Sequence, residues 1–322
     1  MRRKPFIAAA ALVAAYALLA LLRSFEVIGP YWGQVMDQSL IMLISAIGLS
    51  LIYGFTGQFS LGHAAFYGIG AYTAGYITKT MGDSTLWFVL ALLAGTILTG
   101  LVSFLIGLPI LRLKSDYLGI ATLGFGVIVK VLLDNTDKFL PAMGGSRGML
   151  GVPQEATFVW IFWLAALVVL MVRNLIDSSF GRALITVRED EAAADIMGID
   201  TTRMKLLAFV IGCSLAGLAG GLYAHRYPFL HPSSFDFLKS FDVLLVVVMG
   251  GLGSLSGTVV TAVGWVFLME ALQSFLPQSY LEWRGVLYAL ILIVLMIQRP
   301  QGLLGGKEFT FGQKGGSGRV SA

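Results

Sequence analysis

The stretch RNLIDSSFGRALITVREDEAAADIMGIDTTRMK, Arg173 to Lys205, is the longest part of this chain that could not lie inside a lipid bilayer. Helix-forming residues run from Arg182 to Met197, and Gly198 is suited to a left-handed helix stop. Residues suited to cap a helix stand before each helical part: Asp177, Ser178 or Ser179 for the first, and Asp200 or Thr201 for the next. The stretch therefore predicts a short helix between two apolar segments.

The composition indicates the class of protein. Hydrophobic residues make up 57% of the 322 residues and charged residues only 12%, and the mean hydropathy is +0.82. This balance excludes an ordinary soluble domain and indicates a polytopic membrane protein. The single cysteine, Cys213, lies in an apolar run, which excludes an internal disulfide and a cysteine metal cluster.

The apolar segments predict an all-α transmembrane bundle of about ten spans, eight at the fewest, in one domain covering residues 1–322. Each segment must supply roughly 20 residues of helix to cross a hydrocarbon core of about 30 Å. The segments are Phe6–Leu22, Ser39–Gly54, Phe59–Thr78, Leu86–Ile106, Tyr117–Leu133, Phe158–Val172, Leu206–Ala224, Phe241–Leu252, Gly257–Leu276 and Arg284–Ile297. The first resembles a signal peptide, but no small-residue cleavage site follows it, so we expect a retained span.

Basic residues indicate the orientation, because cytoplasmic loops are enriched in lysine and arginine. With an inside N-terminus and ten crossings, fourteen basic residues fall on the cytosolic side and seven outside, while Lys130 lies within the fifth span. The bias predicts cytosolic termini. It also places the charged loop, residues 177–204, and a flexible tail, residues 306–322, in the cytosol.

Two apolar segments are interrupted by small residues. Gly57–Tyr76 presents a small-residue face with four-residue spacing, and Phe241–Gly257 is too short to span comfortably, which leaves a re-entrant segment open. Both contain the pattern G-x-x-S-L, which suggests an internal repeat. Interrupted segments at matching places in two halves indicate a transport pathway; ordinary close helix packing is the other interpretation. The pathway candidates are Gln58, Ser60, His63, Tyr67, Gly251 and Ser254.

Four ionisable residues are expected at membrane depth: His63, Lys130, Asp242 and Glu270. His63 either contacts a solute or bonds a carbonyl of a neighbouring helix. Lys130 is expected to extend to the membrane surface, and the two acidic residues to lie at the interface. The four do not form a recognisable proton relay.

Motifs for catalysis are missing. The segment QGLLGGKE, Gln301 to Glu308, lacks the first glycine and the final hydroxyl of a phosphate-binding loop, so we expect no ATP hydrolysis by this chain. Ser256 has no histidine fixed beside it by the sequence, which leaves intramembrane hydrolysis a remote alternative. The three histidines form no cluster, and we expect neither metal nor cofactor.

Several motifs, in the same order, resemble the permease subunits of bacterial ABC importers of the branched-chain amino acid type, a group that includes urea and amide importers. The resemblance covers residues 34–305. It rests on SLGHAAFYGIGAY after Gln58, YLGIATLGFG from Tyr117, GGSRGMLGVP from Gly144, the stretch Phe180 to Ala224, VVVMGGLGSLSG and RPQGLLG.

The resemblance implies a bacterial inner-membrane system with a second related permease, two ATPase subunits and an extracytoplasmic solute-binding protein. It implies that the cytosolic helix docks in a groove of an ATPase subunit and passes its movement to the membrane helices. The residues expected to take part in this coupling are Gly181, Arg182, Arg188, Glu189, Glu191, Ala192 and Gly198. A solvated connector is the other interpretation.

Two positions depart from the family pattern and leave the solute open. Val127 follows YLGIATLGFG where a glutamate is common, and Arg147 stands in GGSRG. Arg147 is expected to contact the binding protein, or else to steer a carboxylate toward the entrance. We expect a permease for a branched-chain or related amino acid; the alternative is a stand-alone channel or secondary transporter for a small polar solute such as urea.

Overall fold

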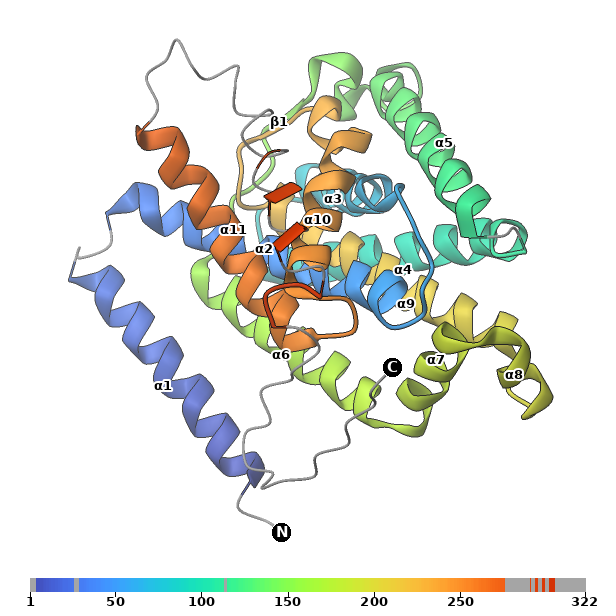
Figure 1. Ribbon diagram of the computed structural model, residues 1–322. Helices are drawn as coiled ribbons and strands as arrows, with labels where there is room; N and C mark the ends of the chain where they lie inside the picture. Colours follow the sequence, from blue (N-terminus) through green and yellow to red (C-terminus); the bar gives the residue numbers. More distant parts are fainter. Residues whose placement is uncertain are drawn as a thin grey trace.

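The computed structural model describes residues 4–25, 29–112 and 115–275, together with residues 290, 293–294, 297–298 and 301–304. Within these ranges the chain is a bundle of helices, and two-residue strands form its one sheet (Figure 1). The tenth predicted span, Arg284–Ile297, lies almost wholly outside the described residues, and the predicted tail, residues 306–322, lies entirely outside them.

The long helices follow the predicted apolar segments. They are α1 (Lys4–Ser24), α2 (Pro30–Leu49) with a π-helical turn η1 (Ser50–Gly54), α3 (His63–Met81), α4 (Thr85–Ile110), α5 (Ser115–Asp134), α6 (Phe158–Asp177), α9 (Thr201–Ala224), α10 (Phe237–Gly250) and α11 (Leu255–Phe275). Six are long and apolar enough to cross a membrane: Pro30–Gly54, Thr85–Ile110, Tyr117–Asp134, Phe158–Asp177, Thr201–Ala224 and Leu255–Ser274. The chain is therefore a polytopic helical membrane protein.

Helix α2 forms the centre of the bundle, and 89% of the residues in its most apolar stretch are buried. It packs against α9, α11, α6 and α10. Glycines allow the backbones to meet: a Cβ on Gly48 would lie 2.4 Å from the carbonyl oxygen of Gly212 in α9. Close backbone approach of this kind drives helix association where lipid removes the hydrophobic driving force.

Helix α3 crosses α9 equally closely, but on a face that differs from the predicted one. A Cβ on Gly70 would lie 2.1 Å from the carbonyl oxygen of Gly217, and one on Gly220 would lie 1.9 Å from that of Tyr67. The face with four-residue spacing consists of Ser60, Ala64, Gly68 and Tyr72. It is a different face, because the nearest atoms to a Cβ on Gly68 belong to Phe235 in the turn η5 (Pro232–Phe235). The four-residue spacing found a packed face, but not the one that meets α9.

Two of the boundaries that differ from the predicted spans have a local cause. Helix α2 begins nine residues before Ser39, because Pro30 occupies its first turn and fixes a helical φ without needing a donor there. Helix α3 begins at His63 rather than Phe59, because Gly57 has φ +71° and residues 55–62 form a loop. The interruption expected in Gly57–Tyr76 is therefore real and lies before the helix.

The connections between the helices gather at two ends of the bundle, which are also the two ends of α6. At the loop end, residues 135–157 and 225–236 meet through an antiparallel pairing of β1 (Met149–Leu150) with β2 (Phe229–Leu230). Residues 135–147 also contain the short turns η2 (Thr136–Lys138), η3 (Pro141–Met143) and η4 (Gly145–Arg147). At the connector end lie α7 (Ser179–Glu189) and α8 (Glu191–Ile196), which project from the bundle far from β1 (Figure 1).

Candidate functional site

The charged segment at the connector end forms two short helices, so the prediction of one helix from Arg182 to Met197 is wrong. Asp190 separates α7 from α8 with an extended backbone, φ −154° and ψ 108°. Its Oδ1 accepts a hydrogen bond from the backbone N–H of Ala193 at 3.0 Å. The break therefore has a local cause, since an aspartate at this position starts a helix better than it continues one.

Three predicted helix ends are confirmed. Ser178 Oγ accepts a 3.5 Å hydrogen bond from the backbone N–H of Gly181, and Asp200 Oδ1 accepts one of 2.9 Å from that of Arg203. Gly198 adopts φ +82°. Gly181 lies where a Cβ would come within 2.0 Å of the Ile176 carbonyl oxygen, so the turn from α6 into α7 is tight.

Arg188 points into the bundle from the end of α7. Its Nη1 donates a 2.6 Å hydrogen bond to the carbonyl oxygen of Gly54, the last residue of η1. Its Nε and Nη2 donate to Glu189 Oε1 at 3.2 and 2.6 Å. The guanidinium therefore joins α7 to the end of α2.

The same arginine lies against both interrupted segments. A Cβ on Gly57 would lie 3.2 Å from Arg188 Cγ, and a Cβ on Gly253 would lie 2.6 Å from its Nη1. A Cβ on Gly54 would in turn lie 3.1 Å from the backbone nitrogen of Gly253. The loops that carry the two G-x-x-S-L patterns thus meet each other and Arg188.

The first glycine of each pattern has the same unusual backbone. Gly57 has φ +71° and Gly251 has φ +104°, a region that favours glycine. The two loops differ in how the following helix is capped. Before α11, Ser254 Oγ accepts a hydrogen bond from the Gly257 N–H, whereas the residue before α3 is Gly62, which has no side chain to cap the helix.

Further contacts tie this end together. Gln58 Nε2 donates a 3.1 Å hydrogen bond to the Lys205 carbonyl oxygen, and Lys205 Nζ pairs with the Glu191 carboxylate. The backbone N–H of Leu303 donates to the Met249 carbonyl oxygen at 2.7 Å. Residues from both halves of the chain and from its last described part therefore surround the base of α7. We call Arg188, Gly54, Gly57 and Gly253 the arginine hub.

The outer side of α8 is exposed and partly apolar. Ile196 and Met197 are 86% and 78% exposed, and Ala192 is also exposed. Arg182 is exposed as well, and its Nη1 donates to the Asp177 carbonyl oxygen at 3.2 Å. Of the predicted coupling residues, Arg188 faces the bundle, whereas Ala192 and Arg182 face outward.

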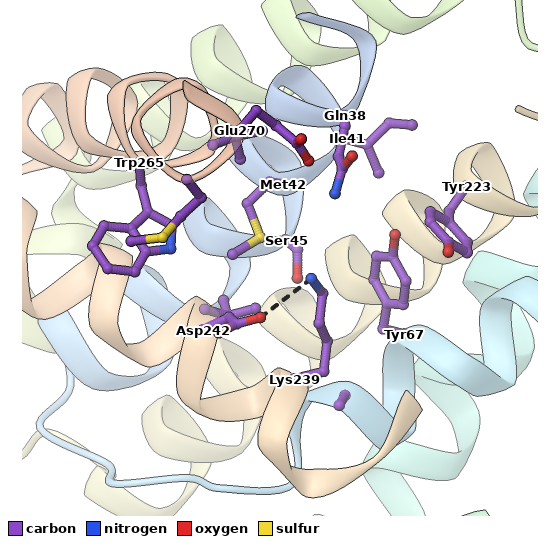
Figure 2. Close-up of a pocket in the computed structure, with 14 residues that line it drawn as sticks. Gln38, Ile41, Met42, Ser45, Tyr67, Tyr223, Lys239, Asp242, Trp265 and Glu270 are labelled. Atoms are coloured by element: carbon purple, nitrogen blue, oxygen red, sulfur yellow. Dashed lines mark hydrogen bonds and ion pairs between the residues drawn. The ribbon is translucent and has the colours of Figure 1, made fainter. Parts of the chain in front are cut away.

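A cavity of about 400 Å³ lies between α2, α3, α9, α10 and α11, in the half of the bundle nearer the loop end (Figure 2). Its charged side chains are Lys239, Asp242 and Glu270, with Lys239 Nζ 3.3 Å from Asp242 Oδ2. Glu270 Oε2 accepts a 2.6 Å hydrogen bond from the Tyr31 hydroxyl. Ile41, Met42, Val243, Trp265, Val266 and Met269 form its apolar wall.

Ser45 is the most buried of the polar residues that line this cavity. Ser45 is 1% exposed, and its Oγ has no hydrogen-bond partner in the described structure. His63 Nε2 lies 2.9 Å from the Ser45 carbonyl oxygen and must donate to it, because a carbonyl only accepts. The structure therefore shows His63 bonded to a neighbouring helix, next to the cavity lining.

The predicted pathway residues separate between the two ends. Tyr67 lines the cavity, and His63 bonds the backbone beneath it. Gln58, Gly251 and Ser254 lie at the connector end, and Ser60 is buried in loop 55–62. The sequence pattern therefore marks the base of the bundle rather than the cavity.

Two other predicted residues lie at the loop end. Arg147 is exposed in η4. Lys130 Nζ pairs with Asp236 Oδ2 at 2.6 Å, which lowers the pKa of the Asp236 carboxyl, mainly through that hydrogen bond. Lys130 thus joins α5 to the start of α10.

The buried carboxylate of Asp37 was absent from the sequence prediction. It is 1% exposed and accepts hydrogen bonds from Arg23 Nη1 at 3.0 Å and from Arg226 Nε at 2.7 Å. The predicted span began after it, at Ser39. A hydrophobic pattern extended back to Pro30, the proline of a first helical turn, would have found Asp37 inside the helix.

The three histidines bond separate parts of the chain. His225 is buried, with Nδ1 2.7 Å from the Gly221 carbonyl oxygen and Nε2 3.0 Å from Thr78 Oγ1. His231 Nδ1 lies 2.6 Å from Ser233 Oγ. Within the described ranges there is no group of three histidine, cysteine or acidic residues placed to hold a metal ion.

Comparison with known proteins gives a consistent result. The model of the family "Branched-chain amino acid transport system / permease component" matches residues 31–296. The high-affinity branched-chain amino acid transport system permease protein LivM of Salmonella typhimurium is 34% identical, over 84% of this chain and 69% of its own length. LivM of Escherichia coli K12 is 33% identical, over 83% and 68%. LivH of Salmonella typhimurium is 26% identical, over 82% and 91%.

No solved structure gives a significant match. The family match covers most of the chain, and the LivM relatives are aligned along more than two thirds of both lengths. The chain therefore belongs to the family of permease components of branched-chain amino acid transport systems.

Proposed function

We propose that this chain is the translocation subunit of an ATP-driven importer for a branched-chain or related amino acid. Its relatives are membrane permeases of ABC importers, so this chain is a translocation component rather than an enzyme. The names of LivM and LivH, both related to it, support a second permease as partner. Two ATPase subunits and an extracytoplasmic binding protein complete the proposed system.

The contacts of α7 and α8 support a coupling role. The exposed apolar tip, Ile196 and Met197, offers a docking surface for an ATPase subunit. The arginine hub lies at the other end of the same segment and touches loops that lead into α3 and α11. A movement of α8 would thus reach two membrane helices through one guanidinium, in the manner of a rigid-body switch. Arg188 is the observation that carries this proposal.

The proposed orientation puts the connector end in the cytosol and the loop end outside. The charge count supports it, because the segment from Arg173 to Lys205 holds five of the fourteen basic residues counted as cytosolic. In this orientation Arg147 and the cavity face the side from which the binding protein delivers the solute. Both termini would then be cytosolic in a bacterial inner membrane.

The proposal is tested with the permease expressed together with its partner permease and ATPase subunits in membrane vesicles. We expect copurification with an ATPase and leucine uptake that requires both ATP and the binding protein. Transport of urea or leucine down its gradient by the purified chain alone, at a comparable rate, would support the channel alternative and overturn the proposal.

A further inference from the structure

The cavity at the loop end combines charges of both signs with an apolar wall. Lys239 and Asp242 come from α10, and Glu270 comes from α11. Figure 2 shows Lys239 and Asp242 on one side of Met42 and Ser45, and Glu270 and Gln38 on the other. A volume of about 400 Å³ falls within the range usual for small-molecule sites.

The Ser45 hydroxyl is a second, independent feature. A buried hydroxyl without a partner is destabilising, and native structures rarely keep one without a reason. Here the hydroxyl lines a cavity large enough to receive a solute, and its residue is 1% exposed. A bound molecule with a polar group would supply the missing hydrogen bond.

The lining selects a chemical class. A ligand carboxylate requires a cation, which Lys239 supplies, and a ligand ammonium requires an anion, which Asp242 and Glu270 supply. Urea would leave the apolar wall without a contact. An aliphatic acid would leave the carboxylates of Asp242 and Glu270 without a cation, and an aliphatic amine would leave Lys239 without an anion. A zwitterion with an aliphatic side chain matches all three parts.

We infer that this cavity is a binding site for a zwitterionic aliphatic amino acid inside the permease, with Lys239 facing its carboxylate, Asp242 and Glu270 facing its ammonium group, and Ser45 at the floor. The inference rests on the proposed function and deepens it, because it names where the solute stops after leaving the binding protein. Lys239 and Asp242, which pair with each other in this structure, exchange that contact for contacts to the solute.

A serine-to-alanine pair tests the role of the floor. Ser45→Ala removes a hydroxyl that has no protein partner, so folding is not expected to suffer, whereas uptake should fall roughly 2- to 12-fold, the worth of one hydrogen bond. Ser39→Ala is the matched control: it removes a buried hydroxyl on the same helix that bonds only the Met36 carbonyl oxygen at 2.8 Å. Equal uptake by the two variants would overturn the assignment of Ser45.

A cysteine at the floor identifies the ligand class directly. In the complete importer, Ser45→Cys is labelled with a small thiol reagent, and labelling of this subunit is read by mass; the native Cys213 is buried. L-Leucine is expected to slow labelling at least fivefold. The probes 4-methylpentanoate, 3-methylbutylamine and urea, which lack the ammonium, the carboxylate or the apolar group, are expected not to. Equal protection by any of them, no protection by leucine, or a cysteine that never reacts would overturn the inference.

ATP-dependent uptake by the wild-type importer is measured in the same vesicles. Uptake without protection would overturn the cavity assignment and leave the importer standing. Protection without ATP-dependent uptake would retain the binding site and overturn the proposed function.

Discussion

At the scale of single residues, Arg188 shows what the charge of a residue leaves open. The family resemblance predicts it as a coupling residue, with its charge available for a contact to an ATPase subunit. In the structure its side chain is 30% exposed and bonds the Gly54 carbonyl oxygen of its own chain. Sequence shows that a residue is charged, but not which way its side chain points, since that depends on the glycine loops 134 residues earlier and 65 later.

Replacing Arg188 should uncouple the importer. Arg188→Ala removes the hydrogen bond to Gly54, and we expect uptake to fall at least tenfold while the ATPase subunits still copurify. Arg188→Lys should recover part of the uptake, because an amine can reach one carbonyl but cannot also pair with Glu189 in the same geometry. ATPase activity and uptake are measured in the same vesicles.

The control for this prediction is Arg203→Ala. Arg203 is an exposed arginine in the first turn of α9, outside the predicted coupling residues, and its loss should change uptake less than twofold. Loss of ATPase copurification in Arg188→Ala would show that the arginine acts at the subunit interface instead.

Asp37 illustrates a residue whose importance the sequence concealed. Asp37→Asn leaves Arg23 and Arg226 without their buried anion, and breaking a buried pair typically costs about 3–5 kcal/mol. We expect lower yield and a melting temperature several degrees lower in detergent, with Asp195→Asn, an exposed change on α8, as the control. An unchanged melting temperature would contradict a structural role for Asp37.

At the scale of elements, helix caps could be predicted and helix continuity could not. Ser178, Gly198 and Asp200 act within one turn, so neighbouring residues determine them. The sequence analysis did not predict the break at Asp190, because good helix formers lie on both sides of it. A run of helix formers predicts one continuous helix, even when a single residue within it is suited to cap a new one. Likewise, Gly57 could be seen in the sequence, but its φ of +71°, which delays α3 to His63, could not.

The apolar tip of α8 gives the element-scale prediction. Ile196→Asp is expected to lower ATPase copurification at least tenfold without reducing insertion, because it puts a charge on a surface that would be buried on docking. Thr186→Asp adds the same charge at an exposed position of α7 and serves as the control. Copurification unchanged in Ile196→Asp would exclude this tip from the interface.

The crossing of α3 and α9 can be tested with one added methyl group. Gly220→Ala places a Cβ 1.9 Å from the Tyr67 carbonyl oxygen, and overpacking of this kind costs about 1–3 kcal/mol. Gly124→Ala is the control, because Gly124 is a helical glycine and a Cβ added to it would have nothing within 4 Å. We expect thermal stability in detergent to fall for the first and to stay level or rise for the second. An equal fall in both variants would indicate that any added methyl group on a helical glycine lowers the stability, and would contradict a close crossing of α3 and α9.

At the scale of the whole molecule, the class of fold could be predicted from composition and segment length alone. The helical bundle and most segment positions follow from the need to bury apolar residues and backbone groups in lipid. The cavity could not be predicted, because its lining comes from five helices and its charged residues lie more than 190 positions after Gln38 and Ser45. Only Tyr67 was shared between the predicted pathway and the cavity.

The contact between Leu303 and Met249 has a consequence for biogenesis. A turn in which Gly302 lies against Gly251 completes the glycine loops of the arginine hub. Gly54 and Gly57 are therefore synthesised early, whereas this turn is synthesised late. The early helices can insert into the membrane as they are made, but the connector end cannot close until residue 303 has been translated. The contact that completes the connector end therefore forms only after most of the described chain has been synthesised.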